Sequence, residues 1–148
     1  MRASWKFACL GAALALSASV LPASAQRIVT AGQSIYYFSG TTADPLNPNI
    51  PAGQPGRMGD SVQQTDSILN KLQAMLEKNG LTFEHVVKAT VFLIADPSKG
   101  NKMDFAGLNS EWAKRFPMDK PRPSRSAIQI TELPLPGGLV EIELIAAK

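Results

Sequence analysis

The stretch VVKATVFLI at residues 86–94 is a nearly continuous apolar run, rich in β-branched residues. Residues of this kind favour the pleated, half-buried surface of a sheet. The run therefore predicts a central strand. Asp96-Pro97 and Gly100-Asn101 follow it directly and predict a turn at its end.

A helix is predicted on each side of this strand along the chain. Before it, Asp60 and Gln63 have the spacing of a capping box, and Asn79-Gly80 predicts the helix end. A 3.6-residue apolar period between them predicts one buried face, with Gln64 off it. The members of that face are Val62, Ile68, Leu69, Leu72, Met75 and Leu76. After the strand, Asp104 caps a second helix. The residues expected to face inward there are Phe105, Leu108, Trp112 and Phe116.

Three further strands are predicted, at residues 34–39, 124–131 and 139–146. In the last one, Glu141 and Glu143 alternate with apolar residues and share one face. Residues 133–138 are turn-forming, which predicts a hairpin between the last two strands. Residues 41–59 carry four prolines and are predicted to form a loop without regular structure.

The resulting order is strand, helix, strand, helix, strand, strand. This order is typical of an α+β domain in which two helices pack on one face of a mixed sheet. No internal repeat is apparent, so residues 26–148 are expected to form a single domain.

The first 25 residues have the pattern of a secretory signal peptide. Arg2 and Lys6 precede an apolar run of about 14 residues, which is too short to span a bilayer. Ala23-Ser24-Ala25 then provides a small-residue cleavage site. We therefore expect a signal peptide at 1–25 and a periplasmic or secreted mature protein.

The mature composition excludes several functional classes. Cys9 is the only cysteine and lies within the signal, so no disulfide, thiol nucleophile or thiolate metal site is expected. Without Arg2 and Lys6, the 15 basic side chains become 13 against 12 acidic ones. The basic residues are also scattered, which argues against nucleic acid as a partner. No membrane partner is expected after cleavage.

Several blocks of the chain, in this order, resemble the reactive-intermediate deaminase (Rid, or YjgF) family. The first is IYYFSG at 35–40, followed by VKATVFL at 87–93 and the stretch from Asn109 to Phe116. The others are PSRS at 123–126 and Leu133-Pro134 with VEIELIA at 140–146. The resemblance covers essentially all of the mature chain.

The resemblance implies a chorismate-mutase-like α+β fold and a homotrimer with sites in the clefts between subunits. It also implies hydrolysis of reactive enamines and imines to 2-keto acids and ammonia, as in 2-iminobutanoate/2-iminopropanoate deaminases. No metal or cofactor is implied. Ribonuclease activity, known for some relatives, is not favoured by the nearly neutral charge.

Particular residues match the family's site. By resemblance, Arg125 binds the substrate carboxylate, Glu141 positions water, and Ser39 lines the pocket from the neighbouring subunit. Gly40 allows the backbone to approach closely there. A guanidinium suits an imino acid because two parallel hydrogen bonds orient its carboxylate. A nearby carboxylate can order a water molecule and move its proton.

The alternative is a non-catalytic trimer that binds a small carboxylate or acts as a chaperone-like protein. Two departures from the family favour it. The position of the family's N-terminal tyrosine corresponds to about Gln26, so this chain lacks that tyrosine. The expected secretion also separates the protein from the cytoplasmic source of 2-aminoacrylate. Tyr36 or Tyr37 is a candidate substitute for the tyrosine. Ala127 also replaces a common cysteine, and the proline-rich loop is longer than usual.

Cleavage after Ala25 is the first testable prediction. Expression in a bacterium with a periplasm should yield a soluble protein that begins at Gln26, because Ala23 and Ala25 fit the peptidase's need for small residues. Intact-mass spectrometry measures this, with allowance for cyclisation of the terminal glutamine. A soluble form that retains residues 1–25 would contradict the prediction.

Overall fold

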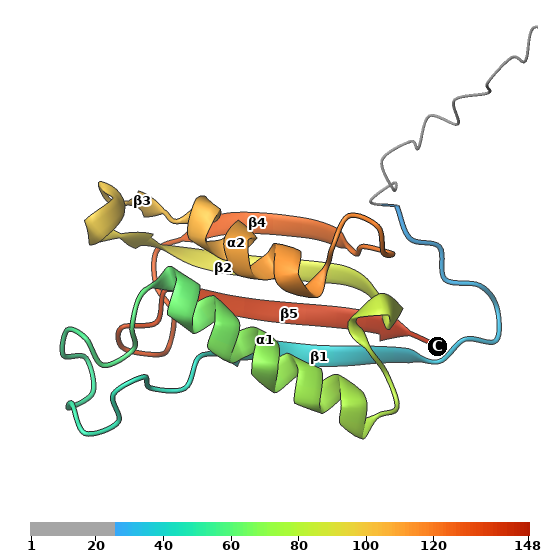
Figure 1. Ribbon diagram of the computed structural model, residues 1–148, viewed down its shortest axis with the longest axis horizontal. Helices are drawn as coiled ribbons and strands as arrows, with labels where there is room; N and C mark the ends of the chain where they lie inside the picture. The colour runs from blue at the N-terminus through green and yellow to red at the C-terminus, as the bar shows by residue number, and fades with distance from the viewer. Residues whose placement is uncertain (1–25) are drawn as a thin grey trace, which may run out of the picture.

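The computed structural model describes residues 26–148, so the predicted signal peptide lies outside the described residues. Within them, the long strands are β1 (Ile35–Thr42), β2 (Val86–Asp96), β4 (Ser124–Ile130) and β5 (Val140–Ala147). The helices are α1 (Ser61–Lys78) and α2 (Phe105–Arg115), with single 3-10 turns η1 (Phe83–His85) and η2 (Pro97–Lys99). A two-residue strand β3 (Lys102–Met103) pairs with the end of β2. Both helices lie on the same side of the sheet, as predicted (Figure 1).

The sheet is mixed, and β5 lies inside it. β5 is antiparallel to β1 on one side and to β2 on the other, whereas β4 runs parallel to β2 at the opposite edge. The predicted hairpin between the last two strands is therefore wrong. Burial explains the order. The helix-facing side chains of β5 are 0–1% exposed, which suits an interior strand, whereas β4 has no residue in the buried class.

Helix α1 begins and ends as predicted. The Asp60 side chain accepts a hydrogen bond from Gln63 N, and the Gln63 side chain accepts one from Asp60 N. Ile68, Leu69 and Leu72 are fully buried against the sheet. Two positions differ from the prediction: Met75 is 38% exposed, and Gln64 is buried.

Gln64 is buried because its side-chain amide forms hydrogen bonds with backbone groups of two loops. Its Nε2 donates to Gly59 O at 3.0 Å and to Gly137 O at 3.1 Å, while its Oε1 accepts from Leu139 N at 2.7 Å. A buried amide is stable only when its polar atoms are paired in this way. Gln64 thus ties the proline-rich loop and the turn before β5 to α1.

The proline-rich segment forms an ordered loop at one end of the molecule (Figure 1). The strand β1 includes Thr41 and Thr42, so the loop starts two residues later than predicted. Asn47 N donates to Arg57 O at 3.0 Å, and the Asn47 side chain donates to Gly56 O at 2.7 Å. The loop therefore closes on itself through its own backbone.

Helix α2 begins at the predicted cap, where Asp104 Oδ1 accepts from Gly107 N at 2.9 Å. Leu108, Trp112 and Phe116 are buried, and the last two rings stack with centroids 4.2 Å apart. Phe105 differs from the prediction because its ring is 42% exposed.

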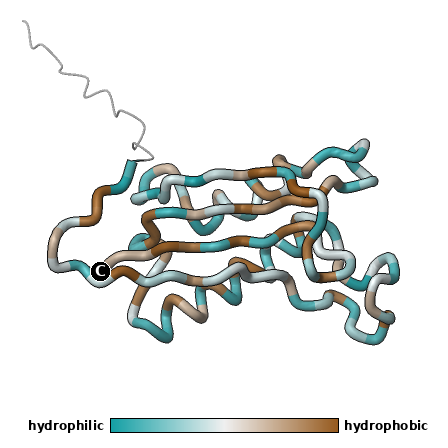
Figure 2. The backbone as a smooth tube through the Cα atoms, turned by 180° about the vertical axis from the view of Figure 1, so that it is seen from behind, coloured by the Kyte–Doolittle hydropathy of each residue, from teal (hydrophilic) through white to brown (hydrophobic). Residues whose placement is uncertain are grey.

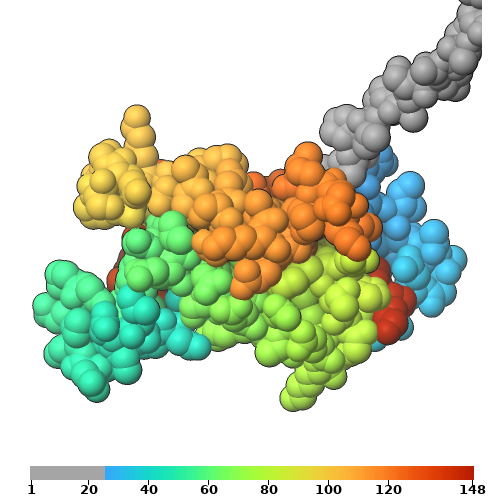
Figure 3. Space-filling view, in the orientation of Figure 1, coloured from blue at the N-terminus to red at the C-terminus, as the bar shows by residue number. Residues whose placement is uncertain are grey.

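The two faces of the sheet have different surroundings. The helices and loops conceal most of the sheet from the front (Figure 3), whereas from behind the four long strands lie nearest the viewer (Figure 2). The alternation of paired residues places Ile35, Tyr37 and Ile128 on the rear face, and these are 48%, 75% and 47% exposed. The rear face is therefore partly apolar and uncovered within one subunit.

Candidate functional site

Arg125 lies on the helix-facing side of β4, beneath α2. Its backbone pairs with Ala89, a fully buried residue of the core. The guanidinium Nη2 donates to Asn109 Oδ1 at 2.6 Å, and Cζ lies 4.6 Å from the centre of the Trp112 ring and 5.5 Å from that of Phe105. Stacking and one hydrogen bond thus hold the plane of the guanidinium in place.

The same guanidinium keeps unused binding capacity. Nη1 is buried and has no hydrogen-bond partner, and no ion pair within residues 26–148 involves Arg125. Burial lowers the pKa of Arg125 below its ordinary value, and the positive charge of Arg122 lowers it further. Arginine still remains protonated at neutral pH. A desolvated cation of this kind favours an anionic ligand.

Glu141 lies on the other face of the sheet. It pairs with Phe92, whereas Arg125 pairs with Ala89, and residues an odd number of positions apart on a strand face opposite sides. Glu141 is half-buried and makes no hydrogen bond or ion pair within the part of the chain that the structure describes. Glu143 shares its face, as the alternation predicted.

Gly40 lies beside Glu141, and Ser39 precedes it along β1. The register between β1 and β5 shifts from Phe38 to Thr41, so both residues bulge out of the ladder. A Cβ on Gly40 would overlap the Glu141 carboxylate and would lie 2.8 Å from its Cδ. The absence of a side chain at position 40 thus makes room for the carboxylate.

The predicted site residues therefore form two groups within one chain. Gly40 and Glu141 meet on β1 and β5, with Ser39 next to Gly40 in the bulge, whereas Arg125 lies on β4 at the other edge of the sheet. Of the two candidate tyrosines, Tyr36 packs against the core and Tyr37 is 75% exposed on the rear face. Neither makes a ring contact with Arg125 in residues 26–148.

The periodicity of α2 predicts that Trp112 faces inward, but it does not predict that Asn109 and Trp112 contact Arg125. Their spacing of three residues places them on one face of α2. That signal was present in the sequence, but nothing in it indicated that β4 passes under this face. The exposed ring of Phe105 completes the surroundings of Arg125.

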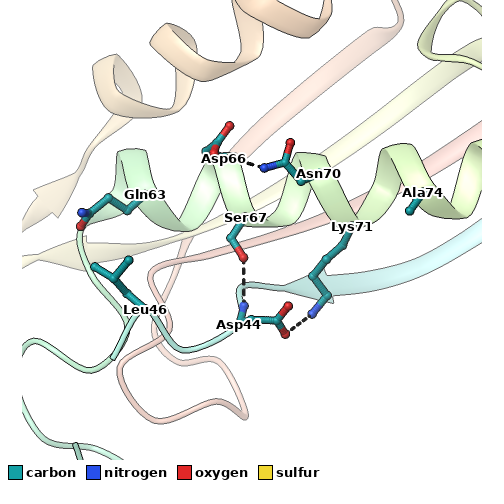
Figure 4. A pocket seen from close by; sticks show the side chains of 8 residues that line it. All are labelled: Asp44, Leu46, Gln63, Asp66, Ser67, Asn70, Lys71 and Ala74. Carbon is teal, nitrogen blue, oxygen red and sulfur yellow. Dashed lines mark hydrogen bonds and ion pairs between the residues drawn. The ribbon is translucent and has the colours of Figure 1, made fainter. Parts of the chain in front are cut away.

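The hollow in Figure 4 is a less suitable site. It measures about 580 Å³ and lies over the outer face of α1, between Leu46 and Ala74. Its charged groups already have partners: Lys71 pairs with Asp44 at 2.8 Å, and Asp66 and Asn70 accept hydrogen bonds from Arg115, outside the hollow, at 2.9 and 2.6 Å. These contacts show that the residues stabilise the surface of the protein and need no ligand as a partner.

Two further findings concern residues 26–148 alone. They contain no helix that is long and apolar enough to cross a membrane. They also contain no group of three or more histidine, cysteine, aspartate or glutamate side chains suited to a metal ion.

Comparison with known proteins places these features in context. The sequence model of the family described as Endoribonuclease L-PSP matches residues 20–148. Protein DfrA of Myxococcus xanthus is 35% identical over 101 residues, covering 68% of this chain and 70% of its own. The 2-iminobutanoate/2-iminopropanoate deaminase of Capra hircus is 37% identical over 90 residues, covering 61% and 59%. A solved YjgF-family structure from Mycobacterium tuberculosis, 26% identical, superposes with a TM-score of 0.57 over 82% of each chain.

The contact between Gly40 and Glu141 generates a prediction. Gly40→Ala should displace the Glu141 carboxylate while lowering the free energy of unfolding by less than about 1 kcal/mol, because the overlapping atoms end a flexible, half-exposed side chain. A crystal structure and urea unfolding measure the two effects. Gly137→Ala is the control, since its φ of +80° should cost about 1 kcal/mol or more. If Gly40→Ala and Gly137→Ala lower the free energy of unfolding equally, the Glu141 side chain is held rigidly.

Proposed function

The chain belongs to the endoribonuclease L-PSP family, which includes the reactive-intermediate deaminases, and from this membership we propose that it hydrolyses imines and enamines of 2-amino acids. The products are 2-keto acids and ammonia. The observation that carries the proposal is the guanidinium of Arg125, which is oriented by α2 and has a buried nitrogen without a partner. An imino acid supplies the carboxylate that this group lacks.

The site lies between two copies of the chain in this proposal. One subunit holds Arg125 and Glu141 on opposite faces of its sheet, so a ligand can touch both only when a second copy contributes one of them. The uncovered rear face, with Ile35, Tyr37 and Ile128, offers the surface for such an assembly. A homotrimer, typical of the family, closes this arrangement with three equivalent sites.

The chemistry follows from the two groups. Arg125 binds the carboxylate through parallel hydrogen bonds and thereby fixes the adjacent C=N carbon. A water molecule adds to that carbon, and Glu141 of the neighbouring copy takes its proton. This proton passes to nitrogen and gives a carbinolamine. Glu141 then transfers the hydroxyl proton to nitrogen as well, so the C–N bond breaks and ammonia leaves as the C=O bond forms. Modest acid–base catalysis suffices, because free imines already hydrolyse in water.

The binding-protein alternative has one specific observation in its favour. Residues 26–34, which precede β1, contain no tyrosine, whereas the family's tyrosine would stand at Gln26. A protein that only binds a small carboxylate would need Arg125 and the cleft but no proton transfer. We further propose that the protein acts in the periplasm or outside the cell, on the strength of the signal-like residues 1–25.

The assembly can be tested at the rear face. Light scattering at micromolar concentration should give the mass of a trimer, and Ile128→Lys should shift it toward monomer because a lysine would be buried without a partner. Leu46→Lys is the matched control: Leu46 is 50% exposed against 47% for Ile128, but it lies on the proline-rich loop. A monomeric wild type would contradict the proposal.

The shared site can be tested by mixing variants. Arg125→Ala should weaken binding of a carboxylate by about 2–4 kcal/mol, with Arg125→Lys recovering only part of it. Glu141→Gln should preserve binding but lower hydrolysis about 100-fold or more. Trimers formed from equal amounts of Arg125→Ala and Glu141→Gln subunits should regain about one quarter of the wild-type rate, because that share of sites combines two intact residues.

Ammonia and keto acid released from imines generated by an amino-acid oxidase provide the readout. Mixed trimers as inactive as the parents would show that the two residues do not meet across a subunit boundary. Turnover in Glu141→Gln equal to that of wild type would remove the proton-transfer role of Glu141.

A further inference from the structure

Arg122 is a second arginine near the same site that the resemblance to the family does not explain. It lies three residues before Arg125, at the entry to β4, and is half-buried. Its guanidinium Nη1 donates to the thioether sulfur of Met118, which is a weak acceptor. No ion pair in residues 26–148 includes it.

The partners of the two guanidiniums lie close together in the sequence, in the C-terminal half of α2 and just after it. Arg125 stacks on Trp112, and the ring of Trp112 stacks on Phe116. Met118 follows Phe116 by two residues and accepts the hydrogen bond from Arg122. The positive charge of Arg122 also contributes to the lowered pKa of Arg125, which agrees with their proximity.

The other half-buried cations of residues 26–148 have oxygen partners; Arg27, Arg57 and Lys88, for example, donate to backbone or hydroxyl oxygens. Five lysine and arginine side chains pair with carboxylates: Lys71, Lys99, Lys114, Arg115 and Lys120. Arg122 and Arg125 have no such partner, although like charges in a half-buried site repel one another. A ligand with one negative charge would neutralise only one of the two.

We propose that the ligand carries two negative charges, and that the substrates are imines of dicarboxylic amino acids. The proposal rests on the deaminase function proposed above and narrows its substrate class. Arg125 binds the carboxylate beside the C=N carbon, and Arg122 attracts the carboxylate at the far end of the side chain. Arg122 is thus a residue that determines specificity and takes no part in the hydrolysis itself.

Binding of stable keto acids tests the charge preference without turnover. Isothermal titration calorimetry of the purified protein should give 2-oxoglutarate a Kd about tenfold lower than that of 2-oxobutanoate, since one added ion pair in a partly buried site contributes on this order. Arg122→Gln should reduce this ratio to about twofold or less, and Arg122→Lys should restore most of it because the charge returns. Lys102→Gln removes the same charge from the exposed strand β3 and should leave the ratio unchanged.

The outcomes separate this inference from the proposed function. Equal affinity of the wild type for both keto acids, or a ratio that is insensitive to Arg122→Gln, overturns the dicarboxylate preference even if monocarboxylic imines are hydrolysed. A ratio that depends on Arg122 supports it even if an oxidase-coupled assay detects no hydrolysis of 2-iminoglutarate or 2-iminobutanoate. In that case the deaminase function fails, and the protein is a dicarboxylate-binding member of the family.

Discussion

The alternation of side chains along β5 connects the core of this protein to its candidate site. Val140, Ile142, Leu144 and Ala146 are 0–1% exposed beneath the helices, so β5 must lie inside the sheet. Because strand residues alternate, the same burial turns Glu141 to the rear face. There the carboxylate occupies the space that Gly40 leaves open in the bulge of β1. A slip of one residue in the register of β5 would turn Glu141 toward the core and its apolar neighbours toward the rear face.

Arg125 occupies the complementary position at the other edge of the sheet. The polar strand β4 is suited to an edge, and there Arg125 reaches Asn109 and Trp112 of α2. Removing a guanidinium from water without a carboxylate partner is unfavourable. A partly buried charge without an opposite partner is commonly found where a charged ligand binds. In the proposed function, the separation of Arg125 from Glu141 within one chain makes the arrangement of subunits part of the chemistry.

Local signals in the sequence were reliable where the physics is local. The capping box at Asp60, the cap at Asp104 and the apolar run of β2 all depend on neighbouring residues, and each lies where predicted. The predictions failed where distant contacts decide. Gln64 is buried because it bonds to backbone groups of two loops, and Phe105 packs beside Arg125 with much of its ring exposed. Neither contact has a trace in the periodicity of the helices.

The sequence by itself determined the elements, the α+β class and the face of β5 on which Glu141 lies, because capping and alternation are set within a few residues. It also carried the family resemblance that singled out Arg125. Only the tertiary structure decided that β5 passes between β1 and β2, and that Arg125 and Glu141 lie on opposite faces. Strand order depends on which apolar faces can be buried together across the whole chain, and a turn sequence such as residues 133–138 contains no information about that choice.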